Sequence, residues 1–288
     1  MTKLALDKLI AAIQDLPSLP AVVLELMHNL DDEAAGAHLL ADKIAQDQAI
    51  SAKVLRLANS SFYGMQRKVT TIQQSITILG FNSVRALVTA TAVIDRYAAN
   101  KDSSLDFDAF WRHSIGTALC AKALARKLSF NQDHAFMTGL LHDIGRLVIV
   151  TYSARHYEPV LAYRAKHGCY LFEAEQNVLG FDHAAVGRAI MQLWKFPPLM
   201  LEAVERHHAS AEETVGRLTA IVRLADCIAH DLDLSGDARD TARPLSDIGW
   251  GGLAISEAGL ENVFQETEQQ FEEACAILVP SDQETRYA

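Results

Sequence analysis

The sequence has few basic residues, and they are not clustered. Among 288 residues there are 26 Lys and Arg against 36 Asp and Glu, so the formal net charge is -10. A protein that binds the phosphate backbone of nucleic acid needs clustered Lys and Arg. This composition therefore argues against a nucleic acid duplex as partner, while it leaves room for a small anionic ligand held by a few local cations.

Cysteines and long apolar runs are also scarce. The four cysteines lie far apart, and no two of them form a C-x-x-C pair, which is typical of a reduced cytosolic protein. The first ten residues lack the basic stretch and apolar run of a secretion signal. The apolar run at residues 147–150 is far too short to cross a bilayer. We therefore expect a cytoplasmic protein with no membrane partner.

The sequence does contain helical periodicity along most of its length, and half of its residues are hydrophobic. Apolar residues recur at the spacing of one helical face, Ala is abundant, and runs of β-branched residues are lacking. These patterns predict an all-α fold. The expected helix N-caps are polar residues that precede apolar periodic segments, namely Asn82, Asp106 or Asp108, Asp133 and Asp182.

A polar, turn-forming segment at residues 98–104 separates two helical patterns. It predicts a boundary between an N-terminal helical half, residues 1–104, and a second helical domain, residues 105–288. In the first half, Asn59 and Ser60 are expected to end a helix with structural hydrogen bonds.

In the second domain, several helices are expected to carry histidines and aspartates. One helix is predicted to carry His142 and Asp143, a second to start at Pro198 and end with His207 and His208, a third to cover residues 215–230 with Asp226, and a fourth to follow Gly251.

These histidines and aspartates predict a metal site. The candidate ligands are His113, His142, Asp143, His183, His207, His208 and Asp226. Imidazole and carboxylate together suit Fe, Mn, Ni or Zn. A single histidine is more often structural, but a charge at Asp143, in an apolar stretch flanked by Gly139 and Gly145, is costly unless it is paired or bound to metal. The two glycines are expected to leave space for other ligands, whereas His230 and the remaining histidines show no partner pattern.

The order of the ligands resembles the HD superfamily of metal-dependent phosphohydrolases, and residues 142–145 match its HDIG signature. Residues 16–20, 49–60 and 76–80 resemble the HDOD family, whose members pair an N-terminal helical half with an HD-like half. The resemblance implies an N-terminal helical bundle packed on an HD-type helical domain.

The resemblance also implies two divalent metal ions bridged by Asp143, a carboxylate with one oxygen for each ion. It assigns His113, His142, Asp143 and Asp226 to one ion, and His183 and His207 to the other. A water between the ions would attack phosphorus. His208 stays open as a further ligand, a proton donor or a solvent-facing neighbour, with a slight preference for the last.

Two departures from related motifs matter. The HD-GYP subgroup, which cleaves cyclic di-GMP, follows its HH pair with Glu and a Gly-Tyr-Pro motif, but here Ala209 follows His208 and no such motif occurs. The family's common HDIGK is HDIGR here. Arg146 lies one turn from His142 and would clamp a substrate phosphate, unless it forms a surface salt bridge. Arg112 and Arg188 are weaker candidates for that role.

Two functions follow as alternatives. The first is a bacterial signalling protein that acts as a metal-dependent phosphohydrolase on a nucleotide or other phosphoester, with Asp143 and Arg146 in the catalytic site. The second is a non-catalytic regulatory module with a vestigial or structural metal site, which docks signalling proteins around Leu57, Phe62 and Tyr63. The intact ligand order favours the enzyme, and the missing Gly-Tyr-Pro motif and the HDOD half favour the module.

Overall fold

The computed structural model describes residues 41–42, 44–45, 48–60, 68–80, 84, 88, 105–194, 196–237 and 253–279. Within these ranges every regular element is an α-helix and there is no strand, so the all-α prediction is confirmed. None of the described helices is both long and apolar enough to cross a bilayer.

The chain divides into two compact units. The larger unit comprises residues 1–16 and 100–267, and the smaller unit comprises residues 17–99 and 268–288. The predicted boundary segment at residues 98–104 lies outside the described residues. The division into domains 1–104 and 105–288 stays a prediction.

In the smaller unit, helix α4 (Gln48–Ala58) packs against helix α5 (Ile72–Leu79). The amide of Asn59 fixes the end of α4, because it donates to the carbonyls of Leu55 and Val69 and accepts from the N–H of Val69. The predicted helix-ending role of Asn59 is thus confirmed. Asn82, Phe62 and Tyr63, predicted as a cap and as docking residues, lie outside the described residues.

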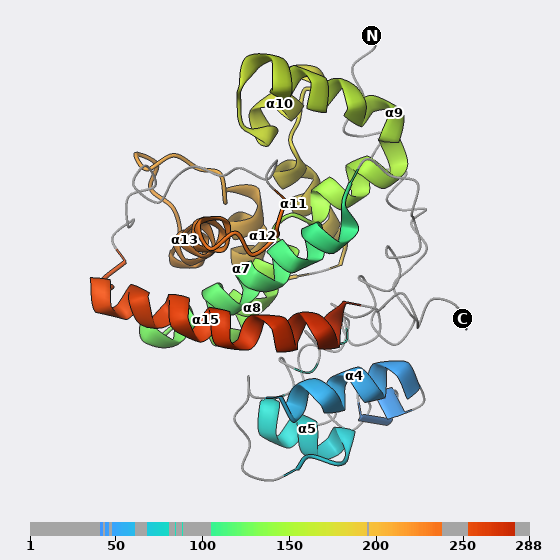
Figure 1. Cartoon of the computed structure of the whole chain (residues 1–288), viewed down its shortest axis with the longest axis vertical. Helices are drawn as coiled ribbons and strands as arrows, with labels where there is room; N and C mark the ends of the chain where they lie inside the picture. Colours follow the sequence, from blue (N-terminus) through green and yellow to red (C-terminus); the bar gives the residue numbers. More distant parts are fainter. Residues whose placement is uncertain are drawn as a thin grey trace. The chain divides into compact units, whose positions relative to one another are not determined.

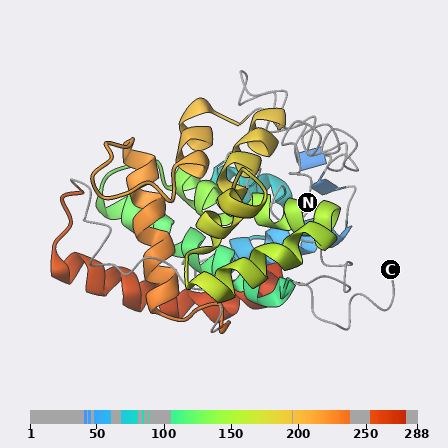
Figure 2. The same cartoon turned by 90° about the horizontal axis from the view of Figure 1, so that it is seen from above.

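The larger unit is built around one central helix (Figures 1 and 2). Its helices are α7 (Phe107–Lys127), α8 (Gln132–Leu141), α9 (Ile144–His167), α10 (Leu171–Val178), α11 (His183–Leu193), α12 (Pro198–Glu205), α13 (Arg217–Asp231) and the first half of α15 (Glu257–Leu278). Helix α7 buries most of its residues, and α8 and α13 pack against it. Helix α11 packs against α9 and α12.

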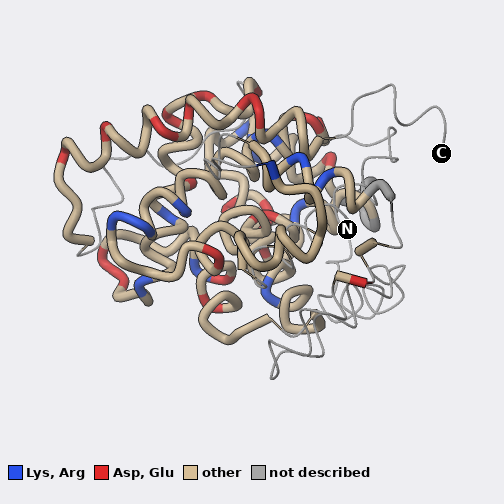
Figure 3. The backbone as a smooth tube through the Cα atoms, turned by 90° about the horizontal axis from the view of Figure 1, so that it is seen from below, with Lys and Arg blue, Asp and Glu red and all other residues tan. Residues whose placement is uncertain are grey.

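Helix α15 confirms the predicted helix after Gly251 and lies against α7. Thr267 hydrogen-bonds with the Cys120 thiol, and Glu266 pairs with Arg126. Acidic residues recur along α15, and it contains no Lys or Arg (Figure 3). Its charged side therefore faces solvent, while residues such as Val263 are buried.

Two of the predicted N-caps are correct and one is wrong. The carboxylate of Asp106 accepts from the N–H of Ala109 at the start of α7, and Asp182 caps α11. Helix α8 is capped by Asn131 instead of Asp133, which lies in its first turn. Asn131 has the extended backbone of a cap, and its side chain accepts from the N–H of the third residue along.

The prediction that one helix carries His142 and Asp143 is also wrong. Helix α8 ends at Leu141 and α9 begins at Ile144, so the pair occupies the turn between them. The Nδ1 atom of His142 donates to the carbonyl of Gly139 at 2.6 Å. In a continuous helix this carbonyl would accept from the backbone N–H of Asp143, four residues later. The turn brings the side chains of His142 and Asp143 close together, with Nε2 of His142 3.6 Å from Oδ1 of Asp143.

The predicted bounds of two other helices also differ from the observed ones. The predicted helix from Pro198 ends at Glu205, so His207 and His208 lie in the turn after α12 and not in the helix. Helix α13 starts at Arg217, two residues later than expected, and still carries Asp226.

Two glycines let the helices of the larger unit approach closely. A Cβ atom at Gly145 would lie 1.9 Å from the carbonyl oxygen of His183, and one at Gly139 would lie 2.9 Å from the Cα atom of Ala118. The space left by the glycines is therefore filled by the backbones of α11 and α7. These are the helices that carry His183 and His113.

We expect Gly145→Ala to destabilise the protein by about 1–3 kcal/mol or more, because the added methyl group would force the α11 backbone away. Thermal denaturation of the metal-free protein measures the effect. Gly259→Ala is the matched control, since a Cβ there meets only side-chain atoms. Equal melting temperatures for the two variants would contradict the close approach.

Candidate metal centre

The candidate ligands come from segments that are far apart in the sequence but meet within the larger unit. They are His113 on α7, His142 and Asp143 in the α8–α9 turn, His183 at the start of α11, His207 and His208 after α12, and Asp226 on α13. All are buried except His208, which is half-buried. The structure thus brings together every residue of the predicted metal set.

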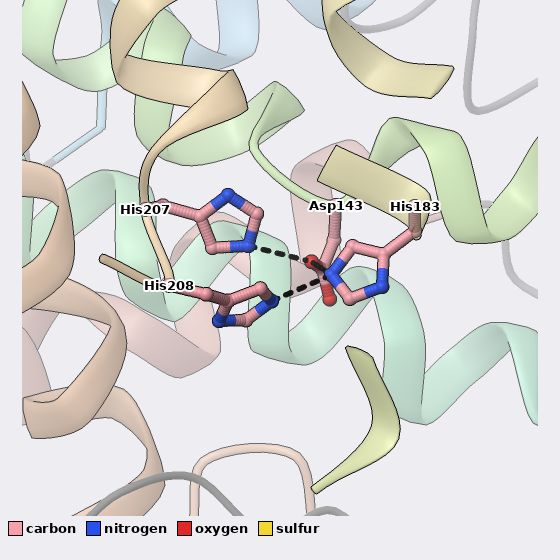
Figure 4. A group of neighbouring side chains, drawn as sticks. All are labelled: Asp143, His183, His207 and His208. Atoms are coloured by element: carbon pink, nitrogen blue, oxygen red, sulfur yellow. Dashed lines mark hydrogen bonds and ion pairs between the residues drawn. The ribbon is translucent and has the colours of Figure 1, made fainter. Parts of the chain in front are cut away.

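One oxygen of Asp143 faces three imidazoles. Its Oδ1 lies 3.1 Å from Nε2 of His183, 3.5 Å from Nε2 of His207 and 3.6 Å from Nε2 of His142. Figure 4 shows two of these rings turned toward the carboxylate. The other oxygen, Oδ2, accepts a hydrogen bond from Nη1 of Arg146 at 3.1 Å. Only Oδ1 faces the histidines, and the expected bridge with one oxygen for each ion stays a prediction.

A second group forms around Asp226. Its Oδ1 lies 3.0 Å from Nε2 of His113 and 3.6 Å from Nε2 of His142. The two Nε2 atoms of these histidines are 3.3 Å apart. His142 therefore lies between the two carboxylates.

His208 joins the group around Asp143. Its Nε2 lies 2.8 Å from Nε2 of His183 (Figure 4). The ring of His208 also stacks on that of Phe172, with centroids 4.5 Å apart. The slight preference for a solvent-facing His208 is therefore not supported. The reason is the turn after α12, which directs both neighbouring histidines inward.

Hydrogen bonds to the backbone fix the tautomers of two rings. Nδ1 of His142 lies 2.6 Å from the carbonyl of Gly139, and Nδ1 of His207 lies 2.7 Å from the carbonyl of Val204. A carbonyl can only accept, so each Nδ1 carries the proton of this hydrogen bond, and Nε2 is the nitrogen that each ring turns toward the carboxylates. This is the orientation of a metal-binding imidazole.

A buried glutamate holds His183. Glu175, on α10 and fully buried, accepts from Nδ1 of His183 at 2.6 Å and from its backbone N–H at 2.8 Å. Burial alone lowers the pKa of His183, but the carboxylates of Glu175 and Asp143 outweigh it and raise that pKa well above its usual value. Glu175 could not be identified from the sequence, because an isolated glutamate eight residues before a histidine belongs to no ligand pattern.

Both aspartates are ionised. Burial alone raises the pKa of Asp143, but the charges of His142 and His183 and the hydrogen bond from His183 outweigh it, so the pKa falls well below the usual range. Burial likewise opposes ionisation of Asp226, and hydrogen bonds from His113 and His142 lower its pKa well below normal. The centre therefore favours positive charge between its carboxylates.

The donor atoms fit a metal ion in spacing as well as in chemistry. Ligands about 2.0–2.1 Å from a tetrahedral ion lie about 3.4 Å from one another. The distances around Asp226 are 3.0–3.6 Å. Within the part of the chain that the structure describes, the buried Nε2 of His207 has no hydrogen-bond partner, and such an atom suits a cation. The residues present therefore fit a divalent metal ion.

Arg146 acts on the carboxylate at the centre. Its side chain is 13% exposed, pairs with Asp143 and lies over the ring of Phe110. The surface salt bridge considered from the sequence is therefore a largely buried one. Arg188 does form a surface pair, with Glu205, and half of each side chain is exposed.

One histidine beside the centre, His230, was not expected there from the sequence. Nε2 of His230 lies 3.5 Å from Oδ1 of Asp226, and its ring centroid is 4.4 Å from that of His113. The signal was present, because residues four apart share a helix face and both Asp226 and His230 belong to α13.

Comparisons with known proteins agree with this fold. The family model described as HDOD domain matches residues 16–210. The crystal structure of a proposed phosphohydrolase from Shewanella amazonensis SB2B is 28% identical, covers 94% of this chain and 97% of its own, and gives a TM-score of 0.76. An HDOD domain protein of unknown function from Geobacter sulfurreducens is 23% identical over 95% of this chain and 98% of its own, with a TM-score of 0.71, which shows the fold alone.

Curated relatives are longer than this chain. An uncharacterized protein of Treponema pallidum (strain Nichols) is 23% identical over 225 residues, which are 77% of this chain and 43% of the relative. Ribonuclease Y of Mycoplasma mycoides is 26% identical over 117 residues, 41% of this chain and 21% of the relative. The chain thus spans less than half the length of these relatives.

We expect Glu175→Gln to weaken metal binding by about 10–100-fold, because the amide keeps the shape of the contact with His183 but removes the charge that makes the ring basic. Competition with a chelator measures the affinity. Glu158→Gln, an exposed change on α9, is the control. Unchanged metal affinity in Glu175→Gln would show that the buried carboxylate does not tune the ligand.

Proposed function

Because this chain belongs to the HDOD domain family, we propose that it is a metal-dependent phosphohydrolase that acts on a nucleotide or another small phosphoester. The observation that carries the proposal is the convergence of imidazole Nε2 atoms and carboxylate oxygens around Asp143 and Asp226. The relative from Shewanella amazonensis, described as a proposed phosphohydrolase, supports the reaction class.

The proposal places two divalent ions in the centre. One would be held by His113, His142 and Asp226, the other by His183, His207 and His208, and Asp143 would be a ligand beside both groups. Two such ions would supply an activated water and polarise a phosphoryl oxygen. Fe, Mn, Ni or Zn are the expected metals, since imidazole and carboxylate suit them.

The protein itself would orient these groups. Arg146 holds Oδ2 of Asp143, which turns Oδ1 toward the histidines. Glu175 fixes the ring of His183 through Nδ1. Since both supports are buried or nearly so, the ligands are held in place before a substrate arrives.

The chemistry of the chain narrows the substrate. The turn after His208 continues as Ala209-Ser210-Ala211-Glu212 without a Gly-Tyr-Pro motif, which argues against cyclic di-GMP. The net charge of -10 argues against a nucleic acid duplex. A small phosphoester that needs only one or two local cations is the better match. The proposed setting is the cytoplasm, where well-separated cysteines stay reduced.

A regulatory module is the second candidate, and the HDOD match itself favours it. The match begins at residue 16 and so includes the N-terminal half, which supplies none of the candidate ligands. In this alternative the half would dock signalling proteins, and the metal centre would be structural. A phosphoesterase screen separates the two candidates.

We expect Asp143→Ala to lose bound metal and all phosphoesterase activity, because the change removes the oxygen that faces three imidazoles. Metal content after purification without chelator, together with turnover of nucleotides, cyclic dinucleotides and generic phosphodiesters, tests both parts on one preparation. Asp108→Ala, exposed on α7, is the control.

Two results would count against this reading. Unchanged metal content in Asp143→Ala would remove Asp143 from the ligand set. Metal-loaded wild-type protein that is inactive on the whole panel would favour the regulatory module.

We expect Arg146→Ala to lower kcat/KM by about 100-fold and also to make bound metal easier to remove with a chelator. The guanidinium donates to Asp143, so its loss disturbs a metal ligand as well as the phosphate clamp expected from the sequence. Arg146→Lys should retain part of the activity, since Lys keeps the charge but not the planar fork. Normal chelator resistance in Arg146→Ala would instead assign the guanidinium to the substrate alone.

A further inference from the structure

His230 lies beside the candidate metal centre but has no place in the ligand set described above. It is the next-to-last residue of α13, four positions after Asp226. Nε2 of His230 lies 3.5 Å from Oδ1 of Asp226, the same oxygen that Nε2 of His113 approaches at 3.0 Å. The side chain of His230 is only 14% exposed.

A simpler role for His230 would be to stabilise the end of its helix. A histidine in the last turn interacts favourably with the helix dipole, and an aspartate four residues earlier adds a weak surface pair. That role needs no burial and no third group. Here the ring is largely buried and lies against that of His113, with centroids 4.4 Å apart, and both face one carboxylate oxygen. Two imidazoles crowded onto one buried oxygen suit a shared cation better than a helix end.

The distances fit such a cation. One donor atom from each of His113, Asp226 and His230 lies within 4.8 Å of the others. His142 adds a third imidazole, with its Nε2 3.3 Å from that of His113 and 3.6 Å from Oδ1 of Asp226. Four of the donor separations in this set lie at 3.0–3.6 Å and bracket the separation of about 3.4 Å expected for nitrogen and oxygen ligands on a tetrahedral ion.

We propose that His230 is a further metal ligand, which completes the set formed by His113, His142 and Asp226. The proposal rests on the metal centre of the proposed function and extends it. Each of the two ions would then have three imidazoles and a carboxylate oxygen, since His183, His207 and His208 accompany Asp143. A donor set this rich in nitrogen selects Zn, Fe or Ni over Mg or Ca.

The test compares metal binding by the whole chain and its His230→Ala variant, with Zn²⁺ and Co²⁺ as the probes. The number of ions retained after dialysis against a chelator gives affinity, and the visible spectrum of the Co²⁺ form reports the number and type of its ligands. We expect His230→Ala to keep one ion while its affinity for the other falls by at least about tenfold, with a changed Co²⁺ spectrum. His167→Ala, an exposed histidine on α9, should behave as wild type.

A second variant guards against a purely structural effect. His230→Glu supplies a different ligand atom at the same position, so it should restore the second ion with a spectrum of its own. If Ala and Glu variants both lose that ion and both melt at a lower temperature without metal, His230 is structural and the proposal is overturned.

The other outcomes separate this inference from the proposed function. A His230→Ala variant that retains both ions with wild-type affinity and spectrum overturns the role of His230 but leaves the phosphohydrolase proposal in place. Wild-type protein that binds neither Zn²⁺ nor Co²⁺ overturns both.

Discussion

The larger unit depends on the burial of two ionised carboxylates, Asp143 and Asp226. An isolated carboxylate in an apolar interior costs several kcal/mol, so it must be surrounded by hydrogen-bond donors or cations. Both aspartates have less than a tenth of their side-chain surface exposed, and imidazoles surround them. The start of α11, the turns after α8 and α12, and single positions on α7 and α13 each bring a ring to one of these oxygens.

Close helix packing makes this possible. The ligands come from different helices, so these helices must pack within reach of two facing side chains, at axis separations of about 8–10 Å or less. The absence of a side chain at Gly145 allows the carbonyl of His183 to lie against α9, and Gly139 does the same for α7. The two glycines at which the helices approach closely thus lie before and after the His142-Asp143 turn. Close helix packing at these glycines is therefore required both by the fold and by the metal centre.

The helices could be predicted from local patterns, but the ends that matter for the site could not. Asp106 and Asp182 have the local signature of N-caps, and the structure uses both. Neither residue of the His142-Asp143 turn is Gly or Pro, so no local pattern predicts a break in the helix there. A hydrogen bond from the His142 side chain to the carbonyl of Gly139 accompanies the break.

The ligands of the site could be predicted because their order along the sequence resembles that of the HD superfamily. That order identified the residues that meet, and the family match over residues 16–210 agrees with it. Glu175 could not be found, because its contact with His183 depends on how α10 packs against α9 and α11. His230 could have been found from its spacing to Asp226, but a single i, i+4 pair on a helix usually has no function.

The arginine of the HDIGR sequence explains how Asp143 is oriented. A lysine, as in the common HDIGK form, is a point charge that can approach either carboxylate oxygen, whereas a guanidinium is planar and directional. Here Arg146 takes Oδ2, and all three histidine contacts of Asp143 then go to Oδ1. A carboxylate free to rotate would exchange its oxygens and loosen both groups of imidazoles. Arg146 therefore supports the metal centre through Asp143 before any part it takes in binding phosphate, and the position that departs from the common motif is the one that fixes the geometry of the site.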